Sequence, residues 1–226
     1  MKSLFLLLAL TAPSFATLVS VGIIDPFDAG NDVVSIRTGS ATDVYQDPSA
    51  ILGGWRQLDV VVVSNPYFRD VRVGAIPETH QFFSETGPLA QATVSLTYDG
   101  NGLGLGGIDL TSGGAANSLG LNLADCDPNL TVTLSITDLD GHLASASLFR
   151  AEAIEAGEVV YFKFSHMDNA AGTDFTRTDK IVLTVDNGVS GDFTANFVGT
   201  FHAPEPGAPM LVAFSTLALA GRRRRV

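Results

Sequence analysis

Hydrophobic and polar residues alternate with a period of two along much of this chain. The clearest stretch is residues 130–137, where every even position is apolar and every odd position carries a small hydroxyl side chain. A strand with one face in a core and the other in water requires this pattern. Similar stretches predict further strands over residues 18–24, 33–37, 58–64, 71–76, 92–98, 119–123, 143–149, 159–164, 180–185 and 193–201.

Turn sequences separate these strands. Asp-Gly-Asn-Gly at 99–102, Asp-Gly at 140–141 and Asp-Asn-Gly at 186–188 supply the positive φ angles that tight hairpins require. Roughly ten or more short strands at this spacing predict an all-β fold, an antiparallel β-sandwich of jelly-roll-like form. Only residues 151–156 have a helical pattern.

A glycine-rich segment covers residues 102–114. A phosphate-binding loop would be followed by a lysine and a helix, and this segment has neither. We expect a tight bend or a close approach of two backbones there.

The first sixteen residues have the pattern of a secretory signal peptide. Lys2 precedes an apolar block at 4–10, and the small residues Ser14 and Ala16 predict cleavage before Thr17 by signal peptidase after Sec export. The block is too short for a transmembrane helix, which needs about 20 apolar residues.

Composition describes the body that would be exported. The 226-residue chain is 46% hydrophobic, enough for one sizeable core, and residues 17–203 contain eight Lys and Arg against 23 Asp and Glu, a formal charge of −15. This balance argues against nucleic acid or anionic lipid as a partner, because phosphate binding needs clustered cations. Cys126 is the single cysteine, so it is either a buried, inert thiol or paired with another molecule.

The C-terminal segment combines three features. Pro204-Glu205-Pro206 cannot continue a helix or a sheet and predicts an extended, accessible spacer. The apolar stretch 207–221 would span about 22 Å as a helix, short of a bilayer core of about 30 Å. Four arginines follow and would stay cytoplasmic as a membrane stop: Arg222, Arg223, Arg224 and Arg225. The segment predicts transient membrane insertion, with an ordinary short anchor as the alternative.

These C-terminal features, in this order and behind a signal peptide, resemble the sorting signal of the PEP-CTERM protein family. The resemblance implies a Gram-negative bacterium that makes extracellular polysaccharide, and processing at Pro204-Glu205-Pro206 by the membrane enzyme exosortase. It further implies passage through the inner membrane to the cell surface or the extracellular matrix. The expected organisation is a signal peptide at 1–16, a β-sandwich ectodomain at 17–201 and a sorting signal at 202–226.

Catalytic motifs are absent from the sequence. It contains no G-x-S-x-G, no H-E-x-x-H and no Cys/His metal cluster. The histidines lack ligand spacing, and we interpret them as surface or core residues rather than catalysts: His80, His142, His166 and His202. A carboxylate pair of the glycosidase type stays open, because carboxylates are abundant.

Two kinds of binding site have candidate residues. Oxygen donors near turns suggest calcium, which takes about six to eight oxygen ligands, although the same residues also form turns and add solubility: Asp138, Asp140, Asp186 and Asp192. Sugar binding uses exposed aromatic faces, for which the candidates are Tyr45, Trp55, Tyr67 and Phe68, with core packing an equal alternative for Trp55.

The function predicted from the sequence is therefore that of a non-enzymatic, exported sandwich that binds or contributes to an exopolysaccharide or biofilm matrix. Two alternatives stay open: a carbohydrate-active hydrolase or lyase on the same fold, and a structural matrix protein without a ligand. The fold cannot choose among them, since sandwiches host many functions.

Overall fold

Short β-strands make up most of the structure, a computed structural model that describes residues 18–28, 33–154 and 157–204. The strands in these ranges are β1 (Val19–Asp25), β2 (Val33–Ile36), β3 (Gly39–Gln46), β4 (Trp55–Ser64), β5 (Val71–Ile76), β6 (Gln81–Glu85), β7 (Gln91–Tyr98), β8 (Ser118–Cys126), β9 (Leu130–Asp138), β10 (Leu143–Arg150), β11 (Glu158–Lys163), β12 (Thr178–Asp186) and β13 (Phe193–His202). All belong to one compact unit, Val19–His202. The predicted signal peptide, its cleavage site at Thr17 and the C-terminal segment from residue 205 onward lie outside the described residues.

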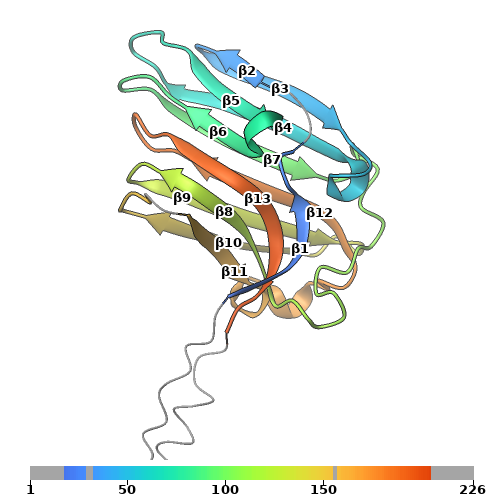
Figure 1. The fold of residues 1–226 in the computed structure, drawn as a ribbon. Helices are drawn as coiled ribbons and strands as arrows, with labels where there is room; N and C mark the ends of the chain where they lie inside the picture. Colours follow the sequence, from blue (N-terminus) through green and yellow to red (C-terminus); the bar gives the residue numbers. More distant parts are fainter. Residues whose placement is uncertain (1–17, 29–32, 155–156, 205–226) are drawn as a thin grey trace, which may run out of the picture. The chain divides into compact units, whose positions relative to one another are not determined.

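The strands form two antiparallel sheets that share one core (Figure 1). The seven-stranded sheet has the order β11-β8-β13-β6-β5-β2, with β1 also paired to β13, and the six-stranded sheet has the order β10-β9-β12-β7-β4-β3. The late strands β12 and β13 lie inside their sheets, between strands from earlier parts of the chain. The predicted all-β antiparallel sandwich is confirmed.

The core comes from the inward positions of the alternating strands. Along β9 and β12 every second residue is buried, and these side chains meet those of β8 from the facing sheet. Each fully buried aliphatic side chain contributes about 1.5–3 kcal/mol relative to an exposed one. The buried apolar positions of the alternating strands, such as those in residues 130–137, are therefore the main source of stability.

The connections sort to two ends of the sandwich. Strand registers place the β2–β3, β4–β5, β6–β7, β8–β9 and β12–β13 connections together at one end, which we call the distal end. The other end, where Val19 pairs with His202, is called the terminal end. It holds the connections β3–β4, β5–β6, β7–β8, β9–β10 and β11–β12. Both ends of the compact unit are therefore neighbours.

One of the three predicted hairpin turns is a hairpin, and the predicted helix is not formed over its described residues. Residues 140–141 do form the β9–β10 hairpin, with Gly141 at φ 84°. Residues 99–102 and 186–188 have the expected positive φ angles, but they connect different sheets and are not hairpin turns. The helix predicted at 151–156 is wrong over 151–154, because Ile154 forms an isolated bridge with Cys126 and buries its side chain; 155–156 lie outside the described residues.

The glycine-rich segment makes the predicted close backbone approach. Leu105 N donates to Asp179 O at 2.7 Å and Ile108 N donates to Thr178 O at 2.9 Å, so the segment lies along the start of β12. A side-chain carbon at Gly104 would overlap the carboxylate of Asp179. Glycine is required there for space as well as for its φ of 82°.

Helical structure is limited to three-residue 3-10 turns over Leu52–Gly54, Pro77–Thr79, Phe164–His166 and Ala170–Gly172 within the described ranges. None of the helices in this part of the chain has the length and apolar character needed to cross a membrane.

A buried ion pair lies between the two sheets. Arg56 of β4 and Asp25 of β1 are both almost fully buried, and the Arg56 Nη1 to Asp25 Oδ2 distance is 2.7 Å. The same carboxylate accepts hydrogen bonds from the Tyr98 hydroxyl at 3.0 Å and from the Phe27 backbone N–H at 3.0 Å. The guanidinium carbon lies 5.4 Å and 5.5 Å from the ring centres of Phe27 and Tyr45. This cluster links β1 with β3, β4 and β7.

We expect Asp25→Asn to destabilise the domain by about 3–5 kcal/mol, because it leaves the guanidinium of Arg56 buried without its counter-charge. Urea unfolding of the domain measures this. The matched control is Asp70→Asn, which breaks the exposed Arg37–Asp70 pair and should change stability far less, because exposed ion pairs contribute little. Equal losses for the two variants would contradict the central role of the buried pair.

Candidate functional site

The outer face of the six-stranded sheet carries the side chains that alternation turns away from the core. Half of those on its four inner strands are hydroxyls, and most are partly exposed. We call this set the hydroxyl face: Thr131, Thr133, Ser135 and Thr137 of β9; Lys180, Val182, Thr184 and Asp186 of β12; Gln91, Thr93, Ser95 and Thr97 of β7; and Trp55, Gln57, Asp59 and Val61 of β4.

The register aligns these side chains in rows across the strands. One row runs from Thr133 through Thr184 and Ser95 to Asp59, at the strand spacing of about 4.8 Å. The hydroxyls of Ser95 and Thr184 are 3.0 Å apart. Thr133 also bonds to the hydroxyl of Ser147 on the edge strand β10 at 2.8 Å, so hydrogen bonds between neighbours hold three hydroxyls of this row in place.

The two carboxylates on the face are already engaged. Asp59 accepts hydrogen bonds from the Thr42 hydroxyl and from Gln57 Nε2, the latter at 2.7 Å. Asp186 accepts from Gln91 Nε2 at 3.1 Å and 3.2 Å and from the Gly188 N–H at 2.9 Å. Their neighbours orient both groups as acceptors on the surface.

The four aromatic candidates for sugar binding lie in three different environments. Trp55 is half-buried on the hydroxyl face, at the terminal end of β4. Tyr45 faces inward from β3, packs against the core and lies under Arg56, so its ring is not on the hydroxyl face. Tyr67 and Phe68 lie in the β4–β5 connection at the distal end, 61% and 64% exposed.

Sequence reasoning missed the polar members of the face. Gln57, Asp59 and the hydroxyl residues of β7 were not candidates, although they occupy the same alternate positions that marked residues 130–137. Their alternation could have marked them as outward-facing positions. Only the strand order shows that the outward positions of β4, β7, β9 and β12 share one face.

The calcium candidates are not brought together. Asp138 and Asp140 lie at the β9–β10 turn of the terminal end, whereas Asp186 and Asp192 lie at the distal end. Within the ranges that the structure describes, no group of three or more His, Cys, Asp or Glu residues is placed to hold a metal ion. The calcium prediction therefore gains no support from the geometry of these ranges.

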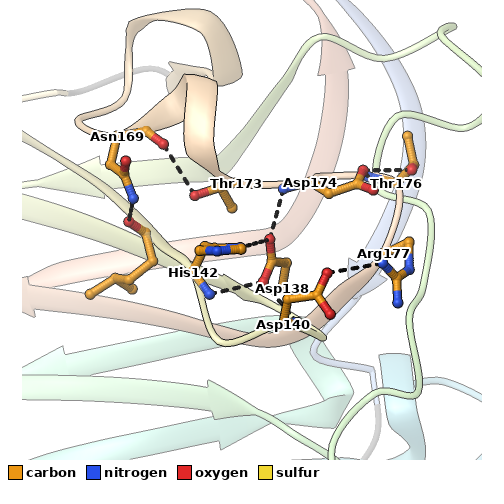
Figure 2. A network of polar contacts seen from close by, with 9 residues as sticks. Asp138, Asp140, His142, Asn169, Thr173, Asp174, Thr176 and Arg177 are labelled. Atoms are coloured by element: carbon orange, nitrogen blue, oxygen red, sulfur yellow. Dashed lines mark hydrogen bonds and ion pairs between the residues drawn. The ribbon is translucent and has the colours of Figure 1, made fainter.

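Asp138 is the centre of a network of hydrogen bonds within the protein (Figure 2). Its buried carboxylate accepts hydrogen bonds from the backbone N–H groups of Asp174 at 3.0 Å and of His142 and Asp140 at 2.9 Å each. His142 Nδ1 lies 3.0 Å from it, and Asp140 pairs with Arg177 at 3.0 Å. Asp138 thus joins the β9–β10 turn to the β11–β12 connection.

These donors hold the pKa of Asp138 well below its usual range. The backbone N–H of Asp174 is the largest cause, burial opposes it, and the bonds from His142 and Asp140 add to the lowering. A carboxylate engaged in this way is part of the scaffold and has little capacity left for a ligand.

We expect Asp138→Asn to lower stability at neutral pH, because an amide nitrogen replaces an oxygen that backbone donors require. A depressed pKa contributes stability above the unfolded-state pKa of about 3.9, and this contribution disappears as the pH falls through the folded-state value. Urea unfolding at several pH values should show the gap between wild type and variant shrinking below about pH 4. Asp140→Asn, on the exposed pair, is the control; a gap that does not change with pH would refute this account.

Comparison with known proteins gives likeness in architecture only. No protein-family model matches the chain, and no curated protein matches its sequence. Among solved structures it is similar to the family 11 carbohydrate-binding module of a cellulosomal cellulase of Clostridium thermocellum, with 12% identity and a TM-score of 0.38, over 82% of this chain and 97% of that one.

Two further structures are similar at the same level. One is a carbohydrate-binding module in complex with β-1,4-galactotriose, with 13% identity and a TM-score of 0.29, over 74% of this chain and 89% of that one. The other is an exo-β-agarase, with 10% identity and a TM-score of 0.39, over 84% of this chain and 25% of that one, so this chain spans about a quarter of it. At such identities the likeness concerns the β-sandwich fold alone.

Proposed function

We propose that this protein is exported and binds extracellular polysaccharide, without catalysis, through the hydroxyl face of its sandwich. The observation that carries the proposal is the composition of that face: rows of hydroxyls, the amides of Gln57 and Gln91, and the ring of Trp55 at one end. Sugar hydroxyls exchange hydrogen bonds with such groups, and the C–H face of a sugar ring packs on an aromatic ring.

The charges on the face favour a neutral polymer. Asp59 and Asp186 are held by their neighbours, and Lys180 Nζ lies 3.2 Å from the carboxylate of Asp99. No cluster of cations faces a ligand from these four strands. A neutral glycan can bind there without leaving an unpaired charge behind.

Carboxylate spacing supports binding rather than hydrolysis. Strand β7 lies between β4 and β12, so the backbones of Asp59 and Asp186 are two strand spacings, about 9.5 Å, apart across the sheet. The two residues are also offset by two positions along the strands. Glycosidases place their two carboxyl groups about 5–9.5 Å apart. The pair on this face is wider than that.

Export and sorting complete the proposal and rest on the sequence pattern. Signal peptidase would cleave before Thr17, and exosortase would process the Pro204-Glu205-Pro206 signal after its transient insertion in the inner membrane. The mature sandwich, with its jelly-roll-like order of strands, would then reach the cell surface or the polysaccharide matrix.

Trp55→Ala should weaken binding to the best neutral polysaccharide by about tenfold or more, because it removes the one aromatic ring on the inner strands of the face. Affinity electrophoresis and a glycan array measure this. Tyr161→Ala, a partly exposed aromatic on β11 of the other sheet, is the matched control and should bind as wild type does. Wild-type protein that binds no neutral glycan would refute the proposed function.

Glu205→Ala should leave an unprocessed, membrane-retained precursor in a host with the cognate exosortase, because the charged residue of the tripeptide is lost. Mass spectrometry of the mature wild-type protein should show that Arg222–Arg225 have been removed. The exposed-residue variant Glu78→Ala is the control and should be processed normally. Mature wild-type protein that retains the arginines would make the segment an ordinary anchor.

A further inference from the structure

A turn in the β4–β5 connection presents two neighbouring aromatic side chains to solvent. Asn65 builds the turn: its Nδ2 donates to Arg37 O at 2.9 Å and to Arg69 O at 2.6 Å, and its Oδ1 accepts from Arg69 N at 3.1 Å. Tyr67 and Phe68 lie between these anchor points and are mostly exposed. The side chain of Asn65 therefore fixes the conformation that carries both rings.

Two exposed residues of this region have strained backbones. Phe68 has a φ of 51°, and Leu89, on the adjacent β6–β7 connection, has a φ of 57°. Bulky residues rarely adopt the left-handed region, and core burial does not repay the strain here, since both side chains are at least half exposed. Strain that persists at an exposed position is typical of a binding surface.

The scaffold around the turn holds it in place. The backbone of Gly87 lies so close to Arg69 that a side-chain carbon would overlap the Arg69 side chain. The Leu89 N–H donates to the Ser190 hydroxyl at 2.7 Å, which links the β6–β7 connection to the β12–β13 connection. The β4–β5 turn therefore packs against the β6–β7 connection, which is itself hydrogen-bonded to the β12–β13 connection.

Arg69 has an unusual position in an acidic protein. Its neighbours Arg37 and Arg72 pair with Asp70 at 2.8 Å and Glu85 at 3.0 Å. Among the residues that the structure describes, no carboxylate pairs with the exposed Arg69 guanidinium. Residues 17–203 contain 23 acidic residues against eight cations, so a cation without a carboxylate partner in the described part of the chain stands out.

We propose that Tyr67, Phe68 and Arg69 form a second saccharide site, for a sugar residue that carries a carboxylate. The rings would pack on the sugar, and the guanidinium would bind its carboxylate through two parallel hydrogen bonds. This inference rests on the proposed function in that the ligand is a polysaccharide, but it concerns a different surface at the distal end of the sandwich.

The overall charge limits which acidic polysaccharides fit. A body with a formal charge of −15 repels a dense polyanion. At physiological salt the screening length is about 8 Å, so one carboxylate in contact with Arg69 is attracted while distant charges are screened. The site therefore takes a sparsely charged chain, with isolated uronic acid residues among neutral sugars.

The test uses pairs of oligosaccharides that differ by one uronic acid: cellotetraose, xylotetraose and β-1,4-galactotetraose, each with and without a glucuronic acid branch. Calorimetry at physiological ionic strength measures their affinity for the wild-type domain. In at least one pair the acidic member should bind about tenfold more tightly, the gain expected of one charge-assisted bidentate contact. Arg69→Gln should abolish that difference, whereas the control Arg72→Gln should retain it.

A second variant separates a binding role from a structural one. Phe68→Gly removes the ring and relieves the positive φ, so it should weaken binding of the acidic member while the melting temperature stays the same or rises. A merely structural Phe68 would give a lower melting temperature with unchanged binding.

The outcomes distinguish the two proposals. If neutral and acidic members bind equally, or if the difference survives Arg69→Gln, the second site is refuted and the hydroxyl face keeps its function. If no member of any pair binds, the second site is refuted, and the glycan array described above decides the proposed function by itself. Trp55→Ala should weaken the binding of the neutral members and leave the Arg69-dependent binding of the acidic members unchanged.

Discussion

The buried pair of Arg56 and Asp25 is the interaction on which the other features depend. A guanidinium without its carboxylate in this position would carry the cost of an unpaired buried charge, so the first strand and the fourth must lie where the two groups meet. The pair joins the seven-stranded sheet to the six-stranded sheet. Because Arg56 points inward, alternation turns Trp55 and Gln57 outward. The buried charge of Arg56, together with the buried Leu58 and Val60, fixes the orientation of the hydroxyl face on β4.

Much of the sandwich could be predicted from local pattern, and the failures have physical reasons. Residues 130–137 and 71–76 gave clear strands because one face of each is buried. Strand β3 was missed because its inward positions include Asp43, so apolar and polar residues alternate only weakly along it. Strand β6 was missed because it is short and its two phenylalanines are adjacent, which breaks the alternation. The helix expected after β10 failed because contact of Ile154 with β8 outweighs a weak local preference.

The candidate site was less predictable, because it depends on contacts between distant residues. Asp25 and Arg56 are separated by 31 residues, and nothing in the local sequence marks either as buried. Tyr45 was expected at a sugar-binding surface but is partly buried against the core, because it lies on the same side of the sheet as its cross-strand partner, the buried Arg56. The hydroxyls of β7 and β12 become one surface only through the strand order, which a single sequence does not encode locally. Tyr67 and Phe68, on a connection with turn chemistry, were visible from the sequence.

The two proposed surfaces differ in whether their charged side chains already have partners in the protein. On the hydroxyl face, acceptors and donors of the protein already engage Asp59, Asp186 and Lys180, so the face contacts a ligand through neutral groups. At the β4–β5 turn, Arg69 lacks a carboxylate partner within the described residues and would gain one from a ligand. One domain could in this way hold the neutral backbone and the acidic branches of the same polymer.

The pairing of Val19 with His202 has a mechanical meaning. A force that pulls these two ends apart would open β1 from β13 one hydrogen bond at a time, like a zipper, and would meet little resistance. A force between His202 and the distal end acts along β13 instead, and loads its bonds to β8 and β6 together, in shear. A domain held beyond His202 and loaded through a polymer at its distal end would be pulled along its resistant direction.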